Sequence, residues 1–160
     1  MANDMGFYIE GWNEFVKNFA QFVDMWDAKK RKLLERMGNI YRGEVMRHVP
    51  VDTSHLIDHI DVYGDGIPLD YIEVGTNVEY ALYVNDGHVQ HKRFLPADRL
   101  SVNGKAKYIK GGAKGIMLSE RYISGAFFME KGLDDAKPRL TRLVNSFMEQ
   151  CAREVEGGRL

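Results

Sequence analysis

Two histidines four residues apart are the first place where this sequence could support chemistry. His55 and His59 would share one face of a helix, and Asp58 or Asp52 could complete a metal site. A second set repeats the idea at other spacings: Asp86, His88 and His91. A histidine beside capping residues in so short a segment is more often a hydrogen-bonding surface residue. We therefore expect no metal and no cofactor, and a metal-dependent hydrolase using His55, His59 and Asp58 is kept only as a minor alternative.

The candidate nucleophiles are equally unpromising. Catalysis by a serine or cysteine needs a base within hydrogen-bond reach and a group that orients that base. No recognisable elbow or oxyanion motif surrounds Ser54, Ser119 or Ser124, and Cys151 lies in a helical apolar stripe. The glycine-rich run 111–115 lacks the spacing and the Lys-Ser/Thr pair of a phosphate loop. The sequence therefore predicts a protein that is not an enzyme.

A long N-terminal helix is the main element that the sequence predicts. Apolar residues recur at three- and four-residue spacing through residues 11–48. Asp24 or Asp27 could cap a second helix after a bend near Val23. Pro50 should end the segment, because the residue before a proline is pushed out of the helical region.

Short elements follow this helix. We expect a helix at 54–58, strands at 60–63 and 71–74 joined by a glycine turn, and a helix at 79–84. Gly87 should end the last of these in the left-handed conformation.

Residues 88–115 lack a clean period and are rich in lysine and glycine, which predicts a long basic loop or a two-stranded arm. Segments 116–118 and 122–123 would form its returning strand. A C-terminal helix should run from 126 to 155, with Pro138 causing a kink or dividing it into two helices. Its expected apolar stripe consists of Leu133, Leu140, Val144, Phe147 and Cys151.

These elements indicate an α+β fold, in which the long N-terminal helix and the C-terminal helix pack on a small antiparallel sheet. We expect a single domain over 1–160, with an N-terminal extension (1–8), an inserted loop or arm (88–124) and a C-terminal tail (156–160). The chain has 160 residues, of which 44% are hydrophobic, so a core can form without disulfides. It has one cysteine, and we find no signal peptide or membrane-spanning run. A soluble protein made in a reducing cytoplasm is expected.

Charge order is the strongest signal. The net charge is −1, which argues against a general nucleic-acid binder, but residues 52–91 carry eight acids and no lysine or arginine. Residues 92–121 carry eight bases and two acids, a net charge of +6. Either these are a solvated acidic face and a solvated loop, or the basic arm docks on the acidic face of a neighbouring copy. Such a head-to-tail contact gives a ring if the rotation closes. The basic candidates are Lys92, Arg93, Arg99, Lys105, Lys107, Lys110 and Lys114, and the acidic candidates are Asp58, Asp61, Asp65, Asp70 and Glu73.

Three stretches carry a family resemblance: Val49-Pro50-Val51-Asp52-Thr53-Ser54-His55-Leu56, then residues 74–88, then Phe127-Phe128-Met129-Glu130-Lys131-Gly132-Leu133. In this order they resemble the tailed-phage minor tail components called tail-completion or head–tail joining proteins. The resemblance spans most of 9–150, with 92–118 as a variable insertion. The family usually has glycine where this chain has Ser54. Serine can cap a helix but pays for a positive φ, so we expect the turn here to differ slightly.

The resemblance implies a structural virion protein of the phage neck. It implies a six-fold ring between a head-side connector or stopper protein and a tail terminator or tail-tube protein. DNA would pass through the ring as cargo, no membrane would be involved, and assembly would take place in the bacterial host cytoplasm. The motif residues would build the fold: Pro50, Asp52, Thr53, Leu56, Gly75, Tyr80, Tyr83, Gly87 and Phe128.

A nucleic-acid-binding accessory protein that uses the basic loop 92–118 is the alternative from another class. It predicts DNA affinity with a steep salt dependence. Only Tyr108 and Phe94 are available there for stacking on bases, and the acidic block beside the loop counts against it.

Overall fold

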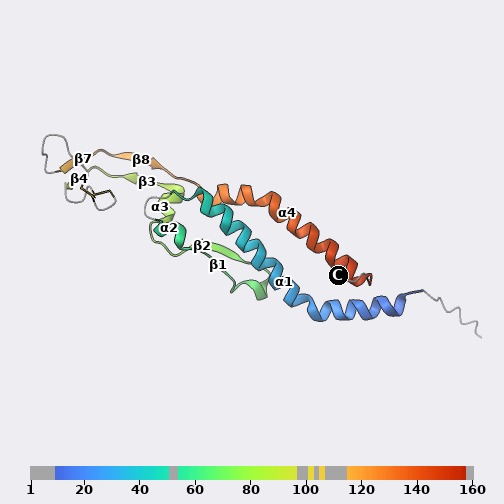
Figure 1. Ribbon diagram of the computed structural model, residues 1–160. Helices are drawn as coiled ribbons and strands as arrows, with labels where there is room; N and C mark the ends of the chain where they lie inside the picture. The colour runs from blue at the N-terminus through green and yellow to red at the C-terminus, as the bar shows by residue number, and fades with distance from the viewer. Residues whose placement is uncertain (1–9, 51–53, 97–100, 103–104, 107–114, 158–160) are drawn as a thin grey trace, which may run out of the picture.

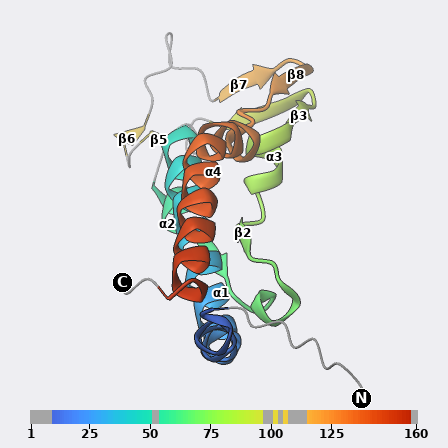
Figure 2. The same ribbon diagram turned by 90° about the vertical axis from the view of Figure 1, so that its right-hand side faces the viewer.

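Two long helices lying side by side form most of the molecule (Figures 1 and 2). The computed structural model describes residues 10–50, 54–96, 101–102, 105–106 and 115–157. The long helices are α1 (Trp12–His48) and α4 (Phe128–Val155), and the shorter elements lie between them in the sequence. These are α2 (His55–Asp58), β1 (Ile60–Tyr63), the 3-10 helix η1 (Ile67–Leu69), β2 (Glu73–Thr76), α3 (Ala81–Asp86), β3 (Gly87–Gln90), β4 (Arg93–Pro96), β5 (Ser101–Val102), β6 (Lys105–Ala106), β7 (Gly115–Leu118) and β8 (Arg121–Ser124). The predicted α+β class is confirmed.

Helix α1 is one continuous helix. It ends as predicted, because Val49 is extended (φ −65°, ψ 125°) before Pro50. The predicted new helix start at Asp24 or Asp27 is wrong. Both residues lie among good helix formers, and Asp27 pairs with Lys30 one turn later, 3.5 Å away. The backbone therefore runs on without a break, and Figure 1 shows the helix axis changing direction in its N-terminal part.

Helix α4 packs along α1 through small residues. A β-carbon at Gly132 would lie 2.6 Å from the Cα atom of Val45, and Ala136 is fully buried. The predicted apolar stripe is right for Cys151, which is buried, and wrong for Leu133, which is exposed. Gly132 and Ala136 take the contact face there, because the two backbones approach too closely for leucine. Pro138 lies inside a single helix rather than between two, in the half where the axis of α4 turns in Figure 1.

A buried carboxylate joins the two helices. The side chain of Glu44 is almost completely buried and forms ion pairs with Arg139 of α4 and with Arg47 on its own helix. Because a buried charge is costly unless it is paired, these contacts fix the register of α1 against α4.

The β1–β2 hairpin packs on α1, where Gly38 makes room for it. A β-carbon on Gly38 would meet Val62 at 2.6 Å and Ile72 at 3.0 Å. The antiparallel register pairs Ile60 with Thr76 and Tyr63 with Glu73. Strand β2 begins two residues later than predicted, because η1 and the positive φ of Asp70 lengthen the turn.

The core lies where α1, α2, β1, α3 and the start of α4 meet, and its buried members are Val45, Val49, Leu56, Ile60, Ala81 and Phe128. Asn85 fastens α3 to α4, because its Oδ1 accepts the backbone N–H of Met129 at 3.1 Å and its carbonyl accepts that of Phe127 at 2.9 Å. Helix α3 thus ends at Asp86, two residues beyond the predicted 79–84.

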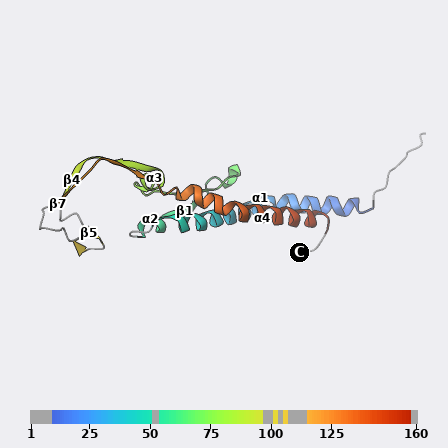
Figure 3. The same ribbon diagram turned by 90° about the horizontal axis from the view of Figure 1, so that it is seen from above.

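Where the structure describes it, the predicted insertion is a two-stranded arm. Strand β3 pairs with β8, and β4 pairs with β7, both antiparallel. The arm begins at Gly87, whose φ is +87° as predicted for a glycine there, although its ψ of 175° is extended. Figures 1 and 3 show the arm projecting beyond the end of the two long helices. The described strands of the molecule pair two by two, in separate ladders rather than in one sheet.

Candidate assembly surfaces

The two candidate metal-binding histidines are used in packing. The rings of His55 and His59 stack with centroids 4.4 Å apart, and the Nδ1 atom of His59 lies 2.7 Å from the carbonyl of His55. The Nδ1 atom of His55 is 3.4 Å from the hydroxyl of Tyr80, and His88 lies edge-on against Tyr83. Within the part of the chain that the structure describes, no three His, Cys, Asp or Glu residues gather as a metal site would require.

Cys151 lies in the interface between the long helices. It is buried, as predicted. Burial raises the pKa of its thiol, and the nearby Glu154 carboxylate acts in the same direction. The thiolate is therefore disfavoured, which is the opposite of what a nucleophilic cysteine needs.

The acidic candidates are all exposed and lie on and around the β1–β2 hairpin. Asp58 ends α2, Asp61 lies on β1, Asp65 is in the turn and Glu73 begins β2. Asp70 is already engaged, since its Oδ1 lies 2.5 Å from the Nζ atom of Lys30. That hydrogen bond raises the pKa of the Lys30 ammonium.

Two of the basic candidates can be placed in full. Lys92 and Arg93 are exposed on the arm, between β3 and β4 and at the start of β4. The backbone of Lys105 forms β6. The other four lie outside the described residues: Arg99, Lys107, Lys110 and Lys114. The arm and the acidic hairpin occupy different parts of the molecule (Figures 1 and 3).

The motif residues divide between core and surface. Leu56 and Phe128 are buried in the core, and Gly75 lies in β2 opposite Asp61. Tyr80 and Tyr83 are exposed on the surface.

Helix α2 begins within the first motif, directly after Asp52, Thr53 and Ser54. Asp52 and Thr53, the predicted caps, lie outside the described residues, and the N-cap residue of α2 is Ser54 with φ +62°. Ser54 therefore adopts a positive φ, which glycine adopts at lower cost.

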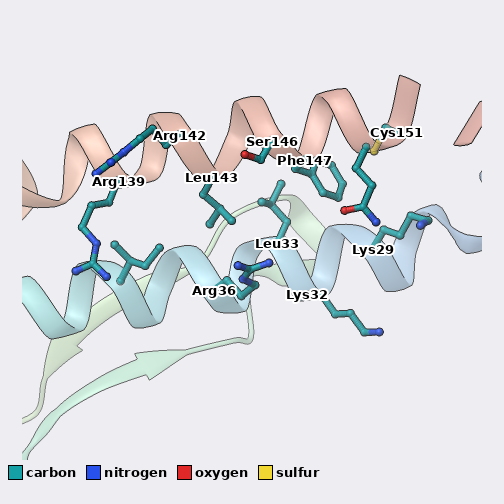
Figure 4. Close-up of a pocket in the computed structure, with 12 residues that line it drawn as sticks. Lys29, Lys32, Leu33, Arg36, Arg139, Arg142, Leu143, Ser146, Phe147 and Cys151 are labelled. Atoms are coloured by element: carbon teal, nitrogen blue, oxygen red, sulfur yellow. The ribbon is translucent and has the colours of Figure 1, made fainter. Parts of the chain in front are cut away.

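A groove of about 620 Å³ lies between α1 and α4. Figure 4 shows its side chains, which come from both helices. Its walls combine apolar and cationic groups: Lys29, Lys32, Leu33, Arg36, Ile40, Arg139, Arg142, Leu143, Ser146, Phe147, Gln150 and Cys151. The sequence does not predict this groove, because the α1 cations line it only once α4 packs beside them. Their spacing (29, 32 and 36) does place them on one side of the helix.

The N-terminal part of α1 carries an exposed aromatic row. Trp12, Phe15 and Phe19 stack in sequence, with centroids 5.8 and 6.1 Å apart, and about half of the Trp12 and Phe19 surface is accessible. The apolar periodicity there is real, but within the described residues α4 leaves this row uncovered.

None of the described helices is long and apolar enough to cross a membrane.

Comparison with known proteins gives one family and one curated relative. Residues 13–87, just under half of the chain, match the family model described as "Bacteriophage HK97-gp10, putative tail-component". The chain is 26% identical to the uncharacterized protein YqbI of Bacillus subtilis (strain 168), over 74% of this chain and 85% of that protein. No solved structure matches the chain significantly. The family match contains the first sequence motif and all but the last residue of the second, and it supports a structural role in a phage. Over residues 13–87, the chain is therefore similar to the HK97-gp10-like phage tail components.

Proposed function

We propose that this protein is a structural component of the phage neck. It completes the tail by forming a ring between a head-side connector or stopper protein and a tail terminator or tail-tube protein. The family resemblance implies six-fold symmetry for this ring. DNA crosses the ring as cargo, and the site of action is the virion. The family match supports the structural role, and the shape of the arm supports assembly.

The arm is the observation that carries the proposal. Its two ladders project from the helices at Gly87 and Gly125, where a β-carbon on Gly125 would lie 2.1 Å from the carbonyl oxygen of Asn85. The arm therefore leaves a tightly packed junction and reaches away from the body of its own chain (Figure 1). A basic extension so placed suits an acidic surface on a neighbouring copy better than the acidic hairpin of its own chain.

Removing charge from the arm tests this role. The triple variant Lys105→Ala, Lys107→Ala, Lys110→Ala should lower the yield of joined particles, and the loss should deepen as salt is raised, because screening weakens the remaining contacts. The matched control removes three cations from the long helices instead: Lys17→Ala, Arg31→Ala, Lys137→Ala. Complementation of a phage lacking the gene, scored by electron microscopy of joined heads and tails, provides the measurement.

Two outcomes count against the proposal. Normal joining by the arm variant would show that the arm does not hold the neck together. A gel shift at physiological salt that the arm variant abolishes would instead favour a DNA-binding accessory role.

A further inference from the structure

The groove between α1 and α4 has the chemistry of a protein-binding site. Leu33, Leu143 and Phe147 line it with apolar surface, and cationic side chains stand around them (Figure 4). Lys29 and Arg139 are paired with Glu154 and Glu44. Within the described residues no carboxylate lies within ion-pair distance of Lys32, Arg36 or Arg142. The groove therefore suits a ligand that is apolar at its centre and acidic around it.

The turn of the β1–β2 hairpin has the complementary surface. Leu69 in η1 is 73% exposed and Tyr71 beside it is 45% exposed, which is unusual for apolar side chains at the tip of a hairpin. Asp65 and Glu73 flank them and are exposed as well. This set, defined here as the hairpin tip, offers an apolar centre with carboxylates on both sides.

The hairpin tip cannot reach the groove of its own chain. The hairpin packs on α1 through Gly38, whereas α4 packs on another side of the same helix through Val45 and Gly132. Helix α1 thus stands between them (Figure 1). A contact between groove and tip must therefore join two copies, and because the two surfaces differ, it is a head-to-tail contact that can close into a ring.

We propose that the α1–α4 groove of one copy binds the hairpin tip of the next, a proposal that rests on the self-assembly proposed above. Leu69 enters the apolar centre, and Asp65 and Glu73 face Arg36 and Arg142. A DNA backbone fits less well, because phosphates would leave the leucines and Phe147 uncovered. The tip follows the C-terminal end of β1, whereas Asp58 lies just before its N-terminal end. The arm of one neighbour and the groove of another can therefore engage different ends of the same acidic hairpin.

Disulfide trapping tests the contact directly, because the chain has one cysteine that can be removed. In a Cys151→Ser background, one preparation carries Leu69→Cys and another carries Ser146→Cys. Mixed and oxidised, they should give cross-linked heterodimers several-fold above a control in which Leu82→Cys replaces Leu69→Cys. Leu82 is a leucine of similar exposure on α3. A chain carrying both cysteines should give a ladder of covalent oligomers.

A charge exchange provides the second measurement. Arg36→Glu with Arg142→Glu should weaken self-association about tenfold, and Asp65→Lys with Glu73→Lys in the same chain should restore it. Restoration would not follow if the arginine changes had merely damaged the fold.

The outcomes separate this inference from the proposed function. Oligomers in sedimentation without cross-links above the control overturn the groove contact and leave ring assembly standing. A chain that stays monomeric at every concentration overturns both. Unchanged oligomers together with lost DNA binding in the Arg36→Glu, Arg142→Glu variant would make the groove a DNA site and overturn the inference.

Discussion

Ser54 has a positive φ immediately before α2. Its φ of +62° is one that L-residues with a β-carbon adopt at a cost of about 1–2 kcal/mol. We predict that Ser54→Gly raises the free energy of unfolding by about 0.5–1 kcal/mol, the gain being reduced by the greater freedom of glycine in the unfolded chain. Urea titration measures the change. Ser54→Ala is the control, which should bring no gain in the free energy of unfolding. A glycine variant less stable than wild type would contradict the positive φ at this position.

Cys151 should react slowly as long as the protein is folded. Burial raises the pKa of its thiol above the ordinary 9.0, so the neutral form is favoured in the folded state. The corresponding contribution to stability is complete below the unfolded pKa and is lost as the pH rises through the folded one. We predict alkylation by iodoacetamide at mildly alkaline pH at least about tenfold slower in native protein than in urea. Equal rates would show that the thiol is exposed.

For single residues, the sequence predicted the conformation or burial of those whose role depends on their own chemistry. Pro50 ends α1, Gly87 has a positive φ and Cys151 is buried, each for a local reason. It could not predict that Leu133 is exposed, because that depends on how closely the backbone of α4 approaches Val45 of α1.

Among the elements, the packing of α4 on α1 depends most on Gly132. Its missing side chain allows the backbone contact with Val45, so Gly132→Ala should lower stability by about 1–3 kcal/mol through overpacking. Gly43, exposed in the C-terminal part of α1, has no atom within 4 Å of the position of a β-carbon. Gly43→Ala is therefore the matched control and should stabilise by about 0.5–1 kcal/mol. Thermal unfolding distinguishes the two, and similar effects at both sites would refute the close approach.

Element types were largely predictable, and their boundaries were less so. Helical periodicity located α1 and α4, and the glycine and lysine content of 88–115 pointed to an arm. Strand β2 and helix α3 each lie two residues from their predicted positions, because η1 and the Asn85 cap depend on contacts made after the chain folds. Asp24 and Asp27 were weak evidence for a helix start, because a residue type that can cap a helix can also lie within one.

Across the whole molecule, the charged and apolar surfaces are the main features of the described residues. The acidic block of residues 52–91 was evident from charge order, and the structure places five of its members around the β1–β2 hairpin: Asp58, Asp61, Asp65, Asp70 and Glu73. The α1–α4 groove was not evident, since its two halves are about one hundred residues apart in sequence and only helix pairing joins them.

The exposed aromatic row on α1 should contribute to contacts between molecules more than to folding. We predict that Phe19→Ser lowers the free energy of unfolding by less than about 1 kcal/mol, whereas Phe128→Ala in the core costs about 3–5 kcal/mol. Urea unfolding of both variants at low protein concentration provides the comparison. A large loss in Phe19→Ser would mean that the row is covered within the single chain.

The central claim is that copies of this chain assemble through complementary charge. Sedimentation velocity of the full chain at low and at high ionic strength tests it most directly. We predict a discrete oligomer at low salt that dissociates as salt is raised, because the basic and acidic surfaces are exposed and screened by ions. A monomer at low salt, or an oligomer indifferent to salt, would contradict the account.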